Sequence, residues 1–153
     1  MTWLALAALT LSFQMPGGMT HEQHMKQMAD AAMGFDQDKI SHHFLLQDRG
    51  GAIEVTAKAD DDAASVAAIR THLRQIAKAF ADGDFSSPLA THGEDPDGVA
   101  TMKRMTGAIA YRYTELPAGA RVTITTNDPA ALDAVHAFLR YQIREHKTGD
   151  TVK

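Results

Sequence analysis

The chain has 153 residues, a net charge of −4 at neutral pH and an apolar fraction of 44%. This size and apolar content fit one compact domain with a short additional segment, and they exclude a mostly disordered chain. The absence of cysteine excludes disulfides, zinc–thiolate sites and iron–sulfur clusters, and the acidic excess argues against a nucleic-acid partner. Eight histidines and eight methionines are the unusual part of the composition.

Residues 1–18 have the pattern of an export signal followed by a linker. Residues 3–13 (WLALAALTLSF) form an apolar run that is too short to span a bilayer as a helix and matches the core of a signal peptide. No Lys or Arg precedes the run, which departs from the usual signal pattern. Despite this departure, the apolar run predicts a periplasmic or secreted protein. The alternative is an uncleaved arm that contacts a membrane or a partner protein.

Residues 19–35 are predicted to form a helix rich in methionine and histidine. Thr20 and Gln23 can form a capping box, and Gly34 stands where a left-handed residue ends a helix. Four side chains share one face of this helix: His21, His24, Met25 and Met28.

Residues 36–153 are predicted to form a ββα-ββα domain. Apolar and polar residues alternate over residues 41–46 and 52–59, and a helical stripe then follows as far as Gly83. A second set of two strands and a helix ends at Gly149.

The two sets align with each other, which indicates an internal repeat. At an offset of 66 residues Phe80 matches His146, and at an offset of 69 residues Ile53 matches Val122. The predicted fold is α+β: a two-layer sandwich with a four-stranded antiparallel sheet, two helices on one face of it, and the added N-terminal helix. The acidic segment of residues 84–101 between the repeats is predicted to be a solvated loop.

Our first functional hypothesis is an exported, non-enzymatic metal-binding protein that buffers or delivers copper. Imidazole and thioether ligands suit copper, and an oxidising compartment disfavours thiolate ligands. The helix residues His21, His24, Met25 and Met28 would supply the ligands, with His42 and His43 nearby in the sequence. The alternative is that the two methionines only pack against the domain.

The remaining histidines support a second hypothesis, a metalloenzyme. His42 and His43 are adjacent on a strand and must point to opposite faces, and the alternation favours an inward His42. An open transition-metal site would form if four side chains met at the edge of the helix–sheet interface: His42, His72, His136 and His146. Ordinary core and helix-flank histidines are the alternative.

A third hypothesis is an interaction subunit without a metal role. The polar face of the sheet or the apolar N-terminal arm would then join a homo-oligomer or an envelope assembly. It predicts a partner that co-purifies with the chain and indifference to metal ions.

Several runs resemble a family of small exported bacterial proteins: residues 33–37 (MGFDQ), 42–44 (HHF), 136–143 (HAFLRYQI) and 148–150 (TGD). The resemblance covers about residues 15–150 and implies export and a compact domain, without a mechanism. Some members of that family carry an automatic label as aspartate carbamoyltransferase. The catalytic chain of that enzyme needs two doubly wound domains, which 153 residues cannot build, and its Ser-Thr-Arg-Thr-Arg run is absent.

Overall fold

The computed structural model describes the chain from Gln23 onward, except residues 24–25, 28–29, 32 and 60–61. The predicted signal-like segment therefore lies outside the described residues. The same holds for four predicted metal ligands: His21, His24, Met25 and Met28. Among the described residues, no helix combines the length and the apolar character that crossing a membrane would need.

Four strands form one antiparallel sheet in the order β1-β2-β4-β3. The strands β1 (Ile40–Gln47) and β2 (Gly50–Ala57) form the first hairpin, and β3 (Ile109–Leu116) and β4 (Gly119–Thr126) form the second. Each hairpin turns through two residues: Asp48 and Arg49 in the first, and Pro117 and Ala118 in the second. The predicted four-stranded antiparallel sheet is confirmed.

The pairing of β2 with β4 shows that the two halves of the domain are related by an approximate two-fold axis. Ile53 and Val122 are equivalent in the sequence repeat, and they also face each other as Cα partners across the two central strands. A residue that pairs with its own counterpart must lie beside the axis. The outer strands β1 and β3 then follow at equivalent positions on the two sides of the sheet.

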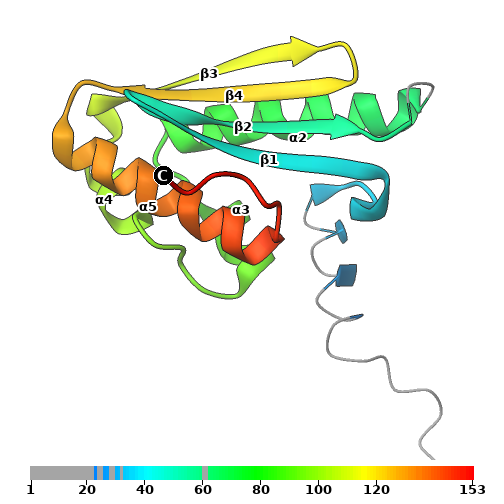
Figure 1. Ribbon diagram of the computed structural model, residues 1–153, viewed down its shortest axis with the longest axis horizontal. Helices are drawn as coiled ribbons and strands as arrows, with labels where there is room; N and C mark the ends of the chain where they lie inside the picture. The colour runs from blue at the N-terminus through cyan, green and yellow to red at the C-terminus, as the bar shows by residue number, and fades with distance from the viewer. Residues whose placement is uncertain (1–22, 24–25, 28–29, 32, 60–61) are drawn as a thin grey trace, which may run out of the picture.

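Two long helices, α2 (Ala63–Ala81) and α5 (Pro129–His146), pack on one face of the sheet (Figure 1). Each helix begins at an aspartate that caps it: the Asp62 carboxylate accepts the Ser65 N–H, and the Asp128 carboxylate accepts two backbone N–H groups of the first turn. The two caps are 66 residues apart, as the repeat predicts. The core lies between these helices and the apolar residues of the inner sheet face.

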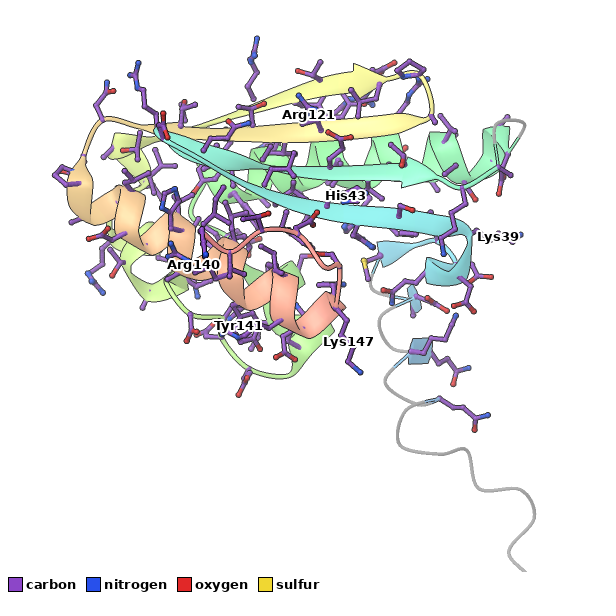
Figure 2. All side chains as sticks on the ribbon, in the orientation of Figure 1. Lys39, His43, Arg121, Arg140, Tyr141 and Lys147 are labelled. Carbon is purple, nitrogen blue, oxygen red and sulfur yellow. The ribbon has the colours of Figure 1, made fainter. Side chains whose placement is uncertain are left out.

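The opposite face of the sheet is polar, as the alternation predicted. Arg121 on β4, labelled in Figure 2, forms an ion pair with Glu54 on the neighbouring strand β2. His43 lies on β1 in the same view, and its side chain is 46% exposed.

The segment between the repeats is only partly the predicted solvated loop: residues 93–98, with the exposed Glu94, Asp95 and Asp97, form a loop, and helices flank it on both sides. These helices are α3 (Ser86–His92) and α4 (Val99–Arg104), and a 3-10 turn follows at Thr106–Ala108. A similar turn, Gln37–Lys39, precedes β1. Val99 and Met102 of α4 are fully buried, so burial of apolar area stabilises this segment.

The acidic residues that follow α3 hold it against α5. The Tyr141 hydroxyl donates a hydrogen bond to Glu94 at 2.9 Å, and Arg144 donates to Asp97 at 2.9 Å. Their carboxylates therefore attach the segment to α5 rather than serving only as a solvated charge cluster.

The C-terminal residues 147–153 run back along α5 to the outer edge of β1 (Figure 1). The Asp150 carboxylate accepts the Phe44 N–H at 2.9 Å and pairs with His43 Nδ1 at 2.9 Å. Burial raises the pKa of Asp150, but the hydrogen bonds from His43, Thr148 and Phe44 outweigh it, and the net pKa lies below its usual range. Asp150 thus gives the edge strand a partner for one exposed N–H.

Replacement of Asp150 should loosen this attachment. We expect Asp150→Ala to lower the free energy of unfolding by about 1–3 kcal/mol, because it removes a half-buried charged hydrogen-bond acceptor. Urea denaturation followed by far-UV circular dichroism would measure the loss. Asp133→Ala, an exposed aspartate on α5, is the matched control and should change stability by less than about 0.5 kcal/mol. Equal losses in both variants would contradict the role of Asp150.

Candidate functional site

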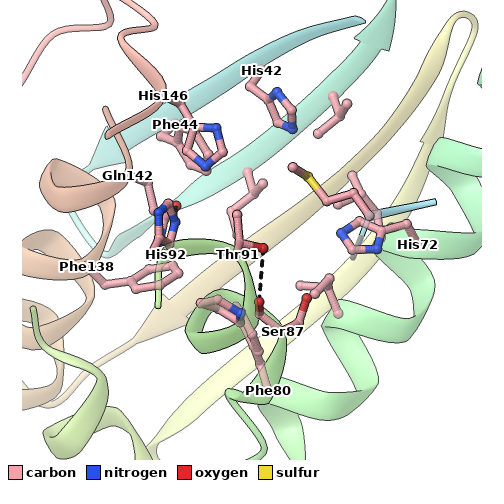
Figure 3. A pocket seen from close by; sticks show the side chains of 16 residues that line it. His42, Phe44, His72, Phe80, Ser87, Thr91, His92, Phe138, Gln142 and His146 are labelled. Carbon is pink, nitrogen blue, oxygen red and sulfur yellow. Dashed lines mark hydrogen bonds between the residues drawn. The ribbon is translucent and has the colours of Figure 1, made fainter. Parts of the chain in front are cut away.

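A pocket of about 60 Å³ opens between the sheet and helices α2, α3 and α5 (Figure 3). Four histidines line it, each from a different element: His42 on β1, His72 on α2, His92 on α3 and His146 on α5. The rest of the lining is mostly apolar, and among the described residues that form it none is Asp, Glu, Lys or Arg. We call this feature the histidine pocket. Its volume suits about four water molecules or a ligand of a few atoms.

His146 lies in ring contact with two of the other histidines. Its ring centroid is 5.0 Å from that of His42 and 5.2 Å from that of His92. His72 stands on the other side of the pocket (Figure 3). Its ring makes a T-shaped contact with the ring of Phe35, with centroids 5.4 Å apart. Residues 42, 92 and 146 are far apart in the sequence, so only the fold brings these rings together.

The local sequence explains why two of these rings point inward. The alternation along β1 places His42 beside the core and His43 on the opposite face, as predicted. His146 occupies the place of Phe80 in the repeat, so a polar ring stands where the first half has an apolar one.

The pocket favours neutral imidazoles. Burial, reinforced by the neighbouring imidazoles His72 and His43, lowers the pKa of His42 to about 4. Burial and the rings of His42 and His92 lower the pKa of His146 to about 3. Burial also lowers the pKa of His72. At neutral pH these rings therefore carry a free lone pair, which is the form that binds metals.

Gln142 on α5 forms a hydrogen bond with His92. The His92 ring nitrogen Nε2 lies 3.0 Å from the Gln142 Oε1 atom, which accepts a hydrogen bond from the ring in the tautomer that carries its proton on Nε2. Gln142 is 4% exposed, and its Nε2 atom is buried without a hydrogen-bond partner among the described residues. The Gln142 amide therefore has one donor without a partner among the described residues.

Of the four histidines predicted to converge, three line the pocket, but they do not form a group around one metal position among the described residues. His42, His72 and His146 line the pocket, whereas His136 lies outside it. The His136 Nε2 atom sits 3.0 Å from the Gln47 carbonyl oxygen and 2.9 Å from that of Gly50, at the β1–β2 turn. These carbonyls at the end of the hairpin draw the ring away from the pocket. His43 is likewise not a pocket residue, because it pairs with Asp150 on the outer side of β1.

His92 is the pocket histidine that the sequence analysis did not include. The short helix that carries it could have been found from Pro88 in its first turn and from Gly93, which ends it in the left-handed conformation. Placing His92 beside His146 requires tertiary information, because it depends on how α3 packs against α5.

Within the part of the chain that the structure describes, no three His, Asp or Glu side chains are already grouped around one metal position. Comparison of the chain with models of known families, with curated proteins and with solved structures found no match. Function therefore has to be inferred from the pocket and its residues.

Proposed function

We propose that this protein binds a copper ion in the histidine pocket, and that it buffers or delivers the ion rather than catalysing a reaction. The proposal is carried by the ring contacts of 5.0 and 5.2 Å that join His146 to His42 and His92. Two imidazoles on one tetrahedral ion with metal–nitrogen distances near 2.05 Å have their centroids roughly 5.2 Å apart. Each contact therefore has the spacing of two ligands on one ion.

Completing such a site requires rotation of the histidine side chains. Among the described histidines, the rings that make hydrogen bonds are those of His43, His92 and His136. The rings of His42 and His146 can therefore turn about the Cβ–Cγ bond without losing a hydrogen bond. In the tautomer with its proton on Nε2, His92 has the arrangement common to metal-bound histidines, in which one nitrogen donates to an outer acceptor and the other is free for the ion.

The lining favours copper over harder ions. Met33 lines the same pocket and supplies a soft thioether, and the described lining residues include no carboxylate of the kind that calcium and magnesium prefer. An exported location, which the N-terminal sequence predicts, would suit a soft site without cysteine.

Replacing two pocket ligands should abolish tight copper binding. Loss of one outer partner of a metal ligand already weakens binding about 10–100-fold, so His42→Gln/His146→Gln should weaken Cu(I) affinity at least ~100-fold. An anaerobic titration against a coloured Cu(I) chelator would measure it. The matched control is His136→Gln, which removes an imidazole of the same helix outside the pocket and should retain the wild-type affinity.

A second variant separates the pocket from the N-terminal residues. Replacement of His21, His24, Met25 and Met28 by alanine should leave the affinity of the pocket unchanged. If this variant lost copper while His42→Gln/His146→Gln kept it, the ion would be held by the N-terminal residues instead. A wild-type protein that bound no copper would overturn the proposed function.

A further inference from the structure

We propose that the C-terminal residues 147–153, which we call the C-terminal tail, shield a self-pairing edge of the sheet. The edge is the outer side of β1, and its partner is β1 of a second copy of the chain, which pairs with it when the tail is displaced. The tail meets this edge through Asp150 and returns to α5 through Val152 (Figure 1). The inference is independent of the proposed copper site.

The first observation is the row of backbone groups along the outer edge of β1. Because β1 pairs with β2 on its other side, alternate residues direct their N–H and C=O groups away from β2: Ile40, His42, Phe44 and Leu46. Asp150 accepts the Phe44 N–H, and the Gln37 carbonyl accepts the Ile40 N–H. Among the described residues, no acceptor is bonded to the N–H groups of His42 and Leu46. The edge therefore has the groups that a further strand needs.

The second observation is how the tail occupies this edge. The Asp150 Oδ2 atom accepts the Phe44 N–H at 2.9 Å, which is the role of a carbonyl oxygen in a neighbouring strand. The Asp150 side chain is 12% exposed, and its Oδ1 atom lies 2.9 Å from His43 Nδ1. Arg140 Nε donates to the Val152 carbonyl at 2.9 Å and so holds the end of the tail on α5. A carboxylate accepts hydrogen bonds but donates none, so the tail blocks the edge without extending the sheet.

The third observation is the contrast between the two edge strands. The other edge strand, β3, carries two exposed charged side chains, Arg112 and Glu115. Charged side chains on an edge strand disfavour pairing with another copy. The eight residues of β1 include no Asp, Glu, Lys, Arg or Pro, so this strand lacks such protection in its own sequence. The tail supplies it instead.

A second copy of β1 is a compatible partner for this edge. Antiparallel pairing centred on Phe44 places His42 opposite Leu46 of the second copy, so the outward N–H and C=O groups of both strands meet. Like charges do not oppose each other in this register, because the strand has no Asp, Glu, Lys or Arg. The two four-stranded sheets would join into one continuous sheet.

Asp150→Ala in the full-length protein removes the carboxylate that covers the edge. We expect this variant to self-associate at least ~10-fold more tightly than the wild type, since loss of a charged hydrogen bond shifts an equilibrium by about that factor. Sedimentation velocity over a range of protein concentrations would measure the association. Hydrogen exchange would locate it: the amides of His42, Phe44 and Leu46 should exchange more slowly as the concentration of the variant rises.

Two further variants separate exposure of the edge from loss of stability. Gly93→Ala changes a left-handed glycine after α3, away from β1, and should keep the association state of the wild type. Asp150→Ala/Leu45→Lys adds a charge beside Phe44 on the outer face of β1 and should return the association to the wild-type level. Circular dichroism would verify that the variants fold. Arg140→Ala, which frees the end of the tail, should shift the association in the same direction and decides if Asp150→Ala does not fold.

Three results would overturn the proposal. The first is an Asp150→Ala protein that associates no more tightly than the wild type. The second is association that Gly93→Ala shares or that Leu45→Lys does not reduce, because loss of stability would then be its cause. The third is association during which the β1 amides exchange at an unchanged rate, because the contact would then lie on another surface.

Discussion

Acidification from about pH 7 to about pH 4 should remove much of the folding free energy, because two buried imidazoles remain neutral in the folded protein while they ionise in the unfolded chain. The pKa of His42 is lowered to about 4 and that of His146 to about 3, from an ordinary value of 6.5. Between pH 6.5 and these lower values the unfolded state binds protons that the folded state does not.

The sign follows from proton linkage. Because the unfolded state binds more protons in this range, stability rises with pH and is lost as the pH falls below 6.5. Each pKa unit corresponds to about 1.4 kcal/mol, so each imidazole removes about 3 kcal/mol by pH 4. Domains of this size are stable by only about 5–15 kcal/mol, so the combined effect brings the protein close to unfolding.

His146→Phe should weaken this pH dependence, since it places in the second repeat the residue that the first repeat has at the same position, Phe80. We expect the loss of unfolding free energy between about pH 6.5 and about pH 4 to shrink by about 3 kcal/mol. Urea denaturation at a series of pH values would measure it. His136→Gln, which leaves both pocket imidazoles in place, should show the wild-type dependence. An unchanged pH dependence in His146→Phe would show that His146 does not cause the loss of stability at low pH.

Among the glycines of the segment between the repeats, replacement of Gly98 by Ala should lower the free energy of unfolding the most. Gly98 precedes α4 with a φ of +82°, and a Cβ atom there would lie 2.1 Å from the Ala134 carbonyl oxygen of α5. The clash would push α4 away from α5 and expose Val99 and Met102, which are now fully buried. Exposure of even one such side chain costs about 1.5–3 kcal/mol, to which the left-handed backbone adds about 1 kcal/mol.

Gly93→Ala is the matched control for this prediction. Gly93 has a similar φ of +76°, but a Cβ atom there would meet nothing within 4 Å. We therefore expect a loss of about 1 kcal/mol for Gly93→Ala and of about 3 kcal/mol or more for Gly98→Ala, measured by urea denaturation. Equal losses would show that backbone conformation, rather than the contact between α4 and α5, decides the effect.

The fold was predicted from short sequence patterns. The strands follow from alternation, and the two long helices follow from apolar stripes that begin at the capping residues Asp62 and Asp128. The symmetric strand order agrees with the repeat, which makes the two hairpins equivalent, but only the structure shows that β2 and β4 are the central pair.

The short helices α3 and α4 were missed for a physical reason. Helices of seven and six residues are too short to show an apolar period and are unstable alone, so packing against α5 stabilises them. The pocket depends on this packing, because α3 brings His92 to His146 and to Gln142.

The sequence by itself determined the positions of the strands and of the two long helices, the internal repeat and the inward direction of His42, because each depends on residues that are neighbours along the chain or on one helix face. Only the tertiary structure decided which histidines meet. His136 and His146 lie on the same helix, yet His136 bonds to carbonyls of the β1–β2 turn while His146 faces His42 and His92. Contacts between distant segments depend on how the elements pack, and side-chain spacing along one element does not contain that information.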